Sequence, residues 1–356
     1  MNTKRLDYLD MVKGIGIILV VLGHIVYTEP HIMVWISSFH MPLFFVVAGV
    51  LMAIKGGEVT DLRGEIMRRV RSLIIPYLWF SLLDFVLDIG NVLLGKIDSH
   101  TFVVNIISSV TFYGKSVLWF LVALFLSQVY FLFLRNKLKD MWVAAAVLVI
   151  AVIAYACKIG LEVVYNLNAE SLLITSIVNL ARTFVRAGIV LPYLAYGYYI
   201  WKFMQKKIEG FNEKPSAGGR AIQLTAGVIL LAIDIICAMT NWSVDTNNMI
   251  MGNPLLYYLG GFAGSFAIIL ICKNLPAFSP VTYLGRNSLI IMATHLDCYI
   301  LWAGLKVGMI IYGLIPIAPV FIGTAVLLTL GICIIPIEII NRFMPFIIGK
   351  RKQSGC

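Results

Sequence analysis

Residues 141–156 read MWVAAAVLVIAVIAYA, a run of apolar and small side chains without a single charge. About 20 residues of this kind are enough for a helix to cross the roughly 30 Å hydrocarbon core of a bilayer. Similar runs recur along the whole 356-residue chain, which is 60% hydrophobic and 13% charged. Soluble domains are only about 45–50% apolar. The composition therefore excludes a soluble globular protein and predicts an all-α, polytopic membrane helix bundle.

Hydropathy predicts about ten transmembrane helices. We place them at residues 13–28, 32–54, 72–95, 116–134, 141–159, 171–201, 221–240, 254–272, 284–303 and 309–336. No polar stretch between them is long enough for a soluble catalytic domain. We therefore expect one transmembrane domain over residues 1–349 and a short basic cytoplasmic tail over residues 350–356.

The net charge of +10 is distributed unequally between the two sides of this predicted topology. The chain has 28 Lys and Arg residues. On the side of the membrane opposite the N-terminus, the predicted segments contain only four of them: Lys96, Lys115, Lys158 and Lys306. Because cytoplasmic loops carry the excess of Lys and Arg, both termini are predicted to be cytoplasmic. The topology accounts for the excess of basic residues, so the charge gives no reason to expect a nucleic-acid partner. We expect a multi-pass protein of the plasma membrane that contacts the lipid bilayer.

Metal and nucleotide motifs do not fit the sequence. Gly14-Ile-Gly16 lacks the third glycine of a dinucleotide fingerprint and follows no strand. The histidines have no short ligand spacing to one another or to cysteine. We therefore predict no metal site and no permanently bound cofactor.

Ionisable side chains inside the hydrocarbon are costly, and each one suggests a functional site. Lys13 and His24 are 11 positions apart in the first span, which corresponds to three helical turns plus about 20°. Both residues are therefore expected on one helix face, with Lys13 at the cytoplasmic rim and His24 just past the middle of the bilayer. A buried neutral histidine can accept a proton from a hydroxyl group and return it, which makes His24 the candidate general base.

Two further histidines are predicted at a similar depth. His40 lies about 13 Å from the outer edge of the second span, and His295 lies about 13 Å from the inner edge of the ninth. If the three histidines lie side by side at this depth, His40 and His295 line the same cavity as His24. A single intramembrane histidine is also often a hydrogen-bonded packing residue, so both interpretations of His40 and His295 stay open here.

A basic cluster precedes the third span and contains Arg68, Arg69 and Arg71. Guanidinium groups bind phosphates through paired hydrogen bonds, so the cluster is a candidate site for a polyanionic nucleotide at the membrane surface. The alternative is that these charges only set the topology or contact anionic lipid.

The sixth span carries Arg182 and Arg186 at i, i+4 spacing. Asp84 and Asp88 have the same spacing in the third span, and Asp234 lies in the middle of the seventh. Opposite charges at this depth are expected to neutralise one another. The alternative is that the two arginines line a cavity or contact the substrate.

Five short motifs resemble acyltransferase family 3, the integral-membrane O-acyltransferases. The first contains the hallmark of that family, a basic residue and a histidine separated by ten residues, and the other four follow in the order in which they occur in the family. They are Arg5-Leu6-Asp7 through Lys13-Gly14 to Gly23-His24, Phe39-His40-Met41-Pro42-Leu43-Phe44-Phe45 with Gly49, Arg68 and Arg71 with Pro76-Tyr77, Trp119-Phe120-Leu121, and Leu284-Gly285-Arg286-Asn287-Ser288-Leu289 followed by His295.

The resemblance implies a bundle of about ten helices that takes an acyl group, usually acetyl, from cytoplasmic acyl-coenzyme A. It implies transfer to a hydroxyl of an extracytoplasmic cell-envelope glycan, with His24 and Lys13 as catalytic residues and Arg68, Arg69 and Arg71 at the donor site. The chain departs from the family at the first hallmark position, where arginine is frequent and Lys13 stands here. Lysine lacks the planar fork of arginine, so its contact differs.

Two other functions are compatible with many spans and intramembrane charges. One is a secondary transporter, although the two halves show no inverted repeat and no paired broken helices. The other is a membrane module that translocates a small solute. Binding of acetyl-coenzyme A distinguishes the acyltransferase from both.

Overall fold

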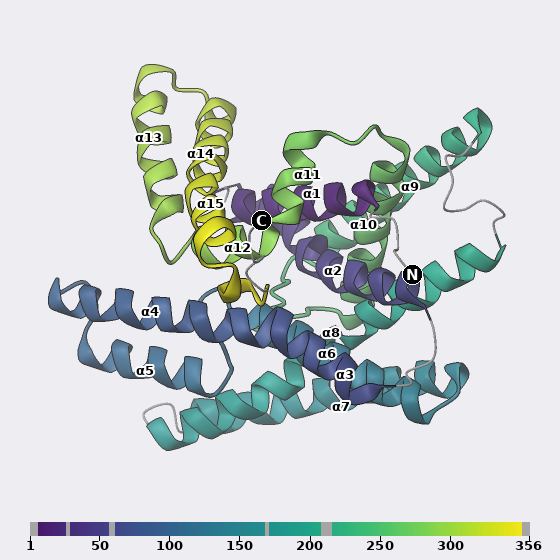
Figure 1. Cartoon of the computed structure of the whole chain (residues 1–356), viewed down its shortest axis with the longest axis horizontal. Coiled ribbons are helices and arrows are strands. Elements are labelled where there is room, and N and C mark those ends of the chain that lie inside the picture. The colour runs from purple at the N-terminus through teal and green to yellow at the C-terminus, as the bar shows by residue number, and fades with distance from the viewer. Residues whose placement is uncertain (1–5, 26–28, 57–60, 168–170, 208–215, 351–356) are drawn as a thin grey trace, which may run out of the picture. The chain divides into compact units, whose positions relative to one another are not determined.

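The computed structural model describes residues 6–25, 29–56, 61–167, 171–207 and 216–350 (Figure 1). These residues are predominantly helical, and within them β-type pairing is limited to the isolated bridge between Asp245 and Ile250. Nine helices within these ranges are long and apolar enough to cross a membrane. The predicted all-α polytopic membrane fold is confirmed. Arg351 and Lys352 of the expected basic tail lie outside the described residues.

The long helices correspond to most of the predicted spans. They are α1 (Asp7–Ile25), α2 (Pro30–Lys55), α3 (Leu62–Arg69) continued by the π-helical turn η1 (Val70–Ile74) into α4 (Ile75–Leu93), α6 (Trp119–Lys137), α7 (Asp140–Leu167), α8 (Leu172–Lys207), α9 (Ala217–Thr240), α10 (Pro254–Asn274), and α14 (Ala318–Ile332) with α15 (Ile334–Phe343). Shorter elements are α5 (Ser99–Val110), α11 (Ser279–Arg286), α12 (Ser288–Thr294), α13 (Ile300–Leu314) and η2 (Pro345–Ile348).

The segment expected as the ninth span, residues 284–303, is not one continuous helix. α11 ends at Arg286, α12 ends at Thr294, and α13 begins at Ile300. At the first break the Asn287 side chain donates a hydrogen bond of 2.9 Å back to the carbonyl of Tyr283. Asparagine competes for backbone groups in this way and ends helices, an effect that hydropathy does not register.

The chain divides into two compact units. Unit 1 contains the chain up to Gly57, Tyr193–Ile291 and Leu301–Gly331, and unit 2 contains Glu58–Pro192, Met292–Ile300 and the chain from Ile332. The division within α8 falls at Pro192, which lies inside the helix. Proline has no backbone N–H, so one hydrogen bond of the helix is missing at this point. The prediction of a single transmembrane domain stays a prediction.

Glycine contacts hold the helices of unit 1 close together. α1 lies beside α11 (Figure 1), and α10 packs against α9 and α2. A Cβ atom added to Gly14 would overlap the backbone carbonyl of Val281, and one added to Gly285 would overlap that of Asp10. Small residues allow such close approach of helix backbones in membranes.

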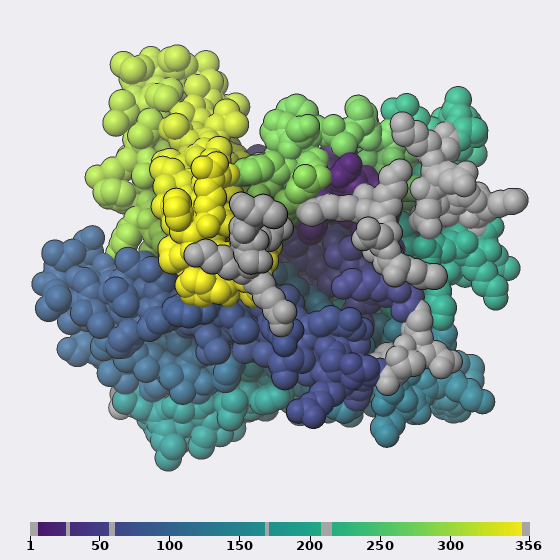
Figure 2. Space-filling model, viewed as in Figure 1, coloured from purple at the N-terminus to yellow at the C-terminus, as the bar shows by residue number. Residues whose placement is uncertain are grey.

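α13 and α14 form a helical hairpin in the same unit (Figure 1), and in Figure 2 their atoms make up one yellow-green lobe. Gly304 faces Thr329, and Gly308 faces Phe321 at 3.2 Å from an ideal Cβ position. Exposed apolar side chains cover the outside of the hairpin, including Met309, Ile310 and Leu327. Such a surface suits contact with lipid rather than water.

In unit 2, α4 packs against α5, and α6 packs against α7. Asp61 begins α3 by accepting a hydrogen bond of 2.8 Å from Gly64 N, and Asp98 begins α5 by accepting one of 2.8 Å from Thr101 N. Hydrogen bonding to Thr101 lowers the pKa of the Asp98 carboxyl below its usual value. An acceptor side chain at this position satisfies a backbone N–H that the helix leaves without a partner.

The crossing of α1 and α11 leads to the first prediction. We expect Gly285→Ala to lower the free energy of unfolding by about 1–3 kcal/mol, because the new methyl group meets backbone that cannot rotate away. Gly160→Ala in α7 is the matched control, since nothing lies within 4 Å of its added Cβ. Thermal unfolding in detergent measures both variants. Equal melting temperatures for the wild type and Gly285→Ala would show that α1 and α11 do not approach this closely.

Candidate active site

α1 carries Lys13 and His24 in one uninterrupted helix, as the predicted shared face requires. The helix begins at Asp7, six residues before the predicted span, and His24 lies in its last turn. The residue His24 is exposed at the surface of the described structure. An accessible histidine at this position can meet a substrate hydroxyl, whereas a fully packed one cannot.

Lys13 lies in a charge cluster where α1 crosses α11. Its Nζ atom is 2.7 Å from Asp10 Oδ1, and Arg286 Nε donates to Asp10 Oδ2 at 3.2 Å. Arg286 also donates to Asp7 at 2.9 Å. The first and last of the five motifs therefore meet within unit 1. Sequence reasoning missed Asp10 as their common acceptor, although its position three residues before Lys13 is a signal for an ion pair on a helix.

His40 in α2 belongs to the same unit as His24, and the two are close enough to interact electrostatically. The Nδ1 atom of His40 is 2.7 Å from the carbonyl oxygen of Ile36. Because a carbonyl only accepts hydrogen bonds, Nδ1 of this ring carries a proton and the neutral ring keeps a lone pair on Nε2. Asp245, in the connection between α9 and α10, also acts on His40 electrostatically. Nothing in the sequence indicated Asp245.

Asp234 of α9 contacts α2 at Trp35 and Ser38, within about one and a half turns of His40. It is fully buried and accepts hydrogen bonds from Trp35 Nε1 at 2.9 Å and from Ser38 Oγ at 2.7 Å. Gly264 of α10 faces both Phe39 and Asp234. The carboxylate thus has two donors inside the helix layer, and it holds the part of α2 that leads to His40.

His295 lies in unit 2, at the end of the broken ninth segment. It is completely buried, and its Nδ1 atom is 2.9 Å from the carbonyl oxygen of Met292. Burial and this backbone contact are compatible with a packing role, and both interpretations of His295 stay predictions. The expected layer of His24, His40 and His295 stays a prediction, because the third member belongs to the other unit.

The arginine cluster divides into exposed and buried members. Arg68 and Arg71 are exposed, whereas Arg69 is only 9% exposed. Glu65 forms ion pairs with both Arg68 and Arg69. The π-helical turn η1 begins at the next residue, Val70, and turns of this kind frequently lie at functional sites. Arg68 and Arg71 are accessible to a ligand, and Arg68 also pairs with Glu65 of its own helix, whereas Arg69 is buried.

Arg182 and Arg186 of α8 contact aromatic rings in unit 2. Arg182 lies over Tyr165 at 4.5 Å, and the fully buried Arg186 lies over Tyr113 at 4.3 Å and Trp119 at 5.1 Å. Arg186 also donates a hydrogen bond of 2.9 Å to the carbonyl of Tyr113. Such cation–π contacts stabilise a buried guanidinium.

The cation beside Asp88 is a lysine. Lys115 Nζ lies 2.8 Å from Asp88 Oδ1, in place of the arginine that we expected. The hydropathy prediction placed Lys115 just outside the fourth span, so it was not considered as a partner of a residue in the third.

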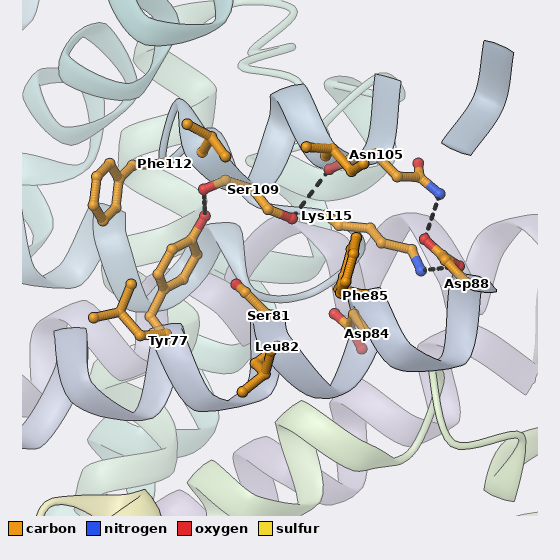
Figure 3. Close-up of a pocket in the computed structure, with 13 residues that line it drawn as sticks. Tyr77, Ser81, Leu82, Asp84, Phe85, Asp88, Asn105, Ser109, Phe112 and Lys115 are labelled. Atoms are coloured by element: carbon orange, nitrogen blue, oxygen red, sulfur yellow. Dashed lines mark hydrogen bonds and ion pairs between the residues drawn. The ribbon is translucent and has the colours of Figure 1, made fainter. Parts of the chain in front are cut away.

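A pocket of about 520 Å³ lies along α4 in unit 2 (Figure 3). Its polar residues include Asp84, Asp88, Asn105 and Lys115. Asp84 and Asp88 lie one turn apart on the same face of α4 (Figure 3). The sequence indicated the two carboxylates, but it gave no signal for the cavity beside them.

The long apolar helices and the ionisable groups buried among them define a polytopic membrane protein. The family model described as an acyltransferase domain, that of acyltransferase family 3, matches residues 6–337, nearly the whole chain. The chain belongs to acyltransferase family 3 and is a membrane acyltransferase. Comparisons with curated proteins and with solved structures returned no match.

The contacts of Asp234 lead to a second prediction. Asp234→Ala leaves the Trp35 Nε1 donor without its acceptor, at a cost of about 1–3 kcal/mol, while Ser38 Oγ keeps only the carbonyl of Trp35, 2.7 Å away. Asp234→Asn keeps one acceptor oxygen and should lose less. We therefore expect the melting temperature to fall in the order wild type, Asn variant, Ala variant. An Ala variant as stable as the wild type would mean that these hydrogen bonds do not hold α2 and α9 together.

Proposed function

We propose that this acyltransferase takes an acyl group, usually acetyl, from cytoplasmic acyl-coenzyme A and transfers it to a hydroxyl of an extracytoplasmic cell-envelope glycan. The acyl donor is a substrate, and the reaction takes place in the plasma membrane. The observation that carries this proposal is the exposed position of His24 at the end of α1, with His40 within electrostatic range in the same unit.

His24 acts as the general base in the proposed reaction. It accepts the proton of the acceptor hydroxyl while the oxygen attacks the carbonyl carbon of the thioester. A carbon–oxygen bond forms and the carbon–sulfur bond breaks, so the products are an ester and the coenzyme A thiolate. His24 then returns the proton to the thiolate. The reaction needs no covalent enzyme intermediate and no metal ion.

Lys13 and His40 support the base from the same unit. The Lys13 ammonium contributes a positive charge on the face of α1 that carries His24, and its ion pair with Asp10 fixes the side chain. The Nδ1 contact of His40 leaves Nε2 as an acceptor for a hydroxyl or for a bridging water.

The donor binds through its phosphates in this proposal. Arg68 and Arg71 are exposed at the N-terminal end of the long helix α3–η1–α4. Two accessible guanidinium groups match the charge and the hydrogen-bonding geometry of a phosphorylated nucleotide. With the N-terminus cytoplasmic, this end of the helix faces the cytoplasm, where acyl-coenzyme A is present.

The role of His24 leads to a third prediction. Acyl transfer from acetyl-coenzyme A by purified His24→Ala should be about 10²–10⁴ times slower than by the wild type, the usual contribution of a general base. The measurement is release of free coenzyme A thiol in the presence of envelope polysaccharide from cells that lack the gene. His100→Ala is the matched control, since His100 is exposed and lies in α5 of the other unit. Wild-type rates for His24→Ala would contradict the assignment.

The exposed arginines lead to a fourth prediction. The double variant Arg68→Ala/Arg71→Ala should bind acetyl-coenzyme A more weakly and with less dependence on salt, because phosphate contacts are electrostatic and are partly screened. Lys137→Ala/Lys139→Ala removes the same charge from the exposed end of α6 and the connection to α7, and should bind as the wild type does. Calorimetric titration measures both. Equal affinity of the two double variants would assign Arg68 and Arg71 to topology or lipid contact.

A further inference from the structure

The pocket beside α4 has a polar floor with hydrogen-bond donors and acceptors in fixed positions. Asp88 connects two of them: its Oδ1 atom is 2.8 Å from Lys115 Nζ, and its Oδ2 atom accepts a hydrogen bond of 2.8 Å from Asn105 Nδ2. Figure 3 shows these groups converging from α4, α5 and the segment that follows α5. The three side chains therefore hold one another in place.

Asp84 lies one turn before Asp88 on α4, but unlike Asp88 it has a side-chain oxygen without a hydrogen-bond partner among the described residues. It lines the pocket and is only 2% exposed, and the oxygen in question is Oδ2. A buried carboxylate oxygen without a donor is costly. A ligand that donates a hydrogen bond at this position would remove that cost.

The wall of the pocket contains strained backbone. Phe112 and Ser116 have φ angles of 58° and 52°, in the left-handed region that non-glycine residues rarely adopt, and Gly114 between them has φ 84°. Arg186 holds this segment through the carbonyl of Tyr113. Strain of this kind persists only where the surrounding structure enforces it, and it is concentrated at functional sites.

Aromatic rings and aliphatic side chains form the rest of the lining. Phe85 is stacked on Phe102 with a centroid distance of 5.8 Å, and Phe112 is stacked on Tyr77 at 5.4 Å. Phe85 is 40% exposed, so part of its side chain is available for contact. An apolar ring face beside a polar floor suits a ligand that has both a polar edge and a carbon–hydrogen face.

The charge of the floor restricts the ligand further. Asp84, Asp88 and the nearby Asp297 contribute three carboxyl groups against the single ammonium of Lys115. A phosphate or another anion is therefore disfavoured. The floor also presents donors from Lys115 and Asn105, which a purely cationic ligand cannot use. Hydroxyl groups both donate and accept, and neighbouring hydroxyls on a sugar ring can bond to Asp84 and to these donors together.

The pocket and the exposed arginines lie on one continuous helix. Arg68 and Asp84 are 16 positions apart (84 − 68), which corresponds to about 24 Å along the helix axis at 1.5 Å per residue. This is most of the roughly 30 Å hydrocarbon thickness of a bilayer. The pocket therefore lies toward the opposite side of the membrane from Arg68.

We infer that this pocket is a saccharide-binding subsite for the acyl acceptor, in which Asp84 accepts a hydrogen bond from a sugar hydroxyl and Phe85 packs against the sugar ring. The inference rests on the proposed function, because it assigns the acceptor of that reaction to these residues. Asp88, Asn105 and Lys115 form the remaining polar edge of the subsite.

The test uses the purified full chain and oligosaccharides released from envelope polysaccharide of cells that lack the gene. We expect Asp84→Asn and Phe85→Leu each to raise the KM for these oligosaccharides about tenfold or more, with the KM for acetyl-coenzyme A unchanged. Direct binding of the oligosaccharides without donor should weaken to a similar degree. Glu162→Gln is the matched control, since Glu162 pairs with Lys158 on the surface of α7 and is remote from the pocket lining.

The outcomes separate this inference from the proposed function. If wild-type protein binds no acetyl-coenzyme A, the proposed function fails, whatever the saccharide result. If turnover is normal and both pocket variants keep the wild-type KM for the oligosaccharides, the subsite assignment fails alone. Spermidine is the cationic probe: binding of spermidine that Asp84→Asn abolishes, with unchanged saccharide binding, would overturn the assignment in favour of a cation site. Phe85→Leu keeps the test decisive if Asp84→Asn does not fold.

Discussion

The cost of leaving a polar group without a partner among apolar helices is the constraint on which this structure depends. In hydrocarbon, backbone groups are satisfied by helices and charged side chains by pairing. Asp10 binds Lys13 and Arg286, Asp88 binds Lys115 and Asn105, and Asp234 binds Trp35 and Ser38. Each carboxylate connects elements that are distant in sequence. The same constraint makes the unsatisfied oxygen of Asp84 informative, because a ligand that donates a hydrogen bond to it, as we propose, would remove the cost of its burial.

Sequence patterns predicted the parts of the fold that depend on composition alone. Runs such as residues 141–156 have one stable solution in a bilayer, so the existence of the long helices followed directly. The break at Asn287 did not follow, because it depends on one side chain bonding to Tyr283 rather than on average hydropathy. The π-helical turn at Val70–Ile74 was likewise invisible to a hydropathy window.

The candidate site shows the same division. Helical periodicity placed Lys13 and His24 on one face of a helix, and a continuous α1 agrees with this. Periodicity does not report partners far along the chain, and for that reason the Asp10–Arg286 and Asp88–Lys115 pairs were missed. It also does not report burial within a basic cluster, where Arg69 is buried while Arg68 and Arg71 are exposed. Tertiary contacts decide which of several similar residues faces a ligand.

The central claim is that this membrane acyltransferase acylates a hydroxyl of an envelope glycan. Mass spectrometry of envelope polysaccharide from cells with and without the gene tests it most directly, with growth on isotopically labelled acetate to identify the donor carbon. The account predicts a mass increase of one acyl group per modified residue, carrying the label, only in cells that have the gene. Identical polysaccharide masses in the two strains, with the protein present in the membrane, would contradict it.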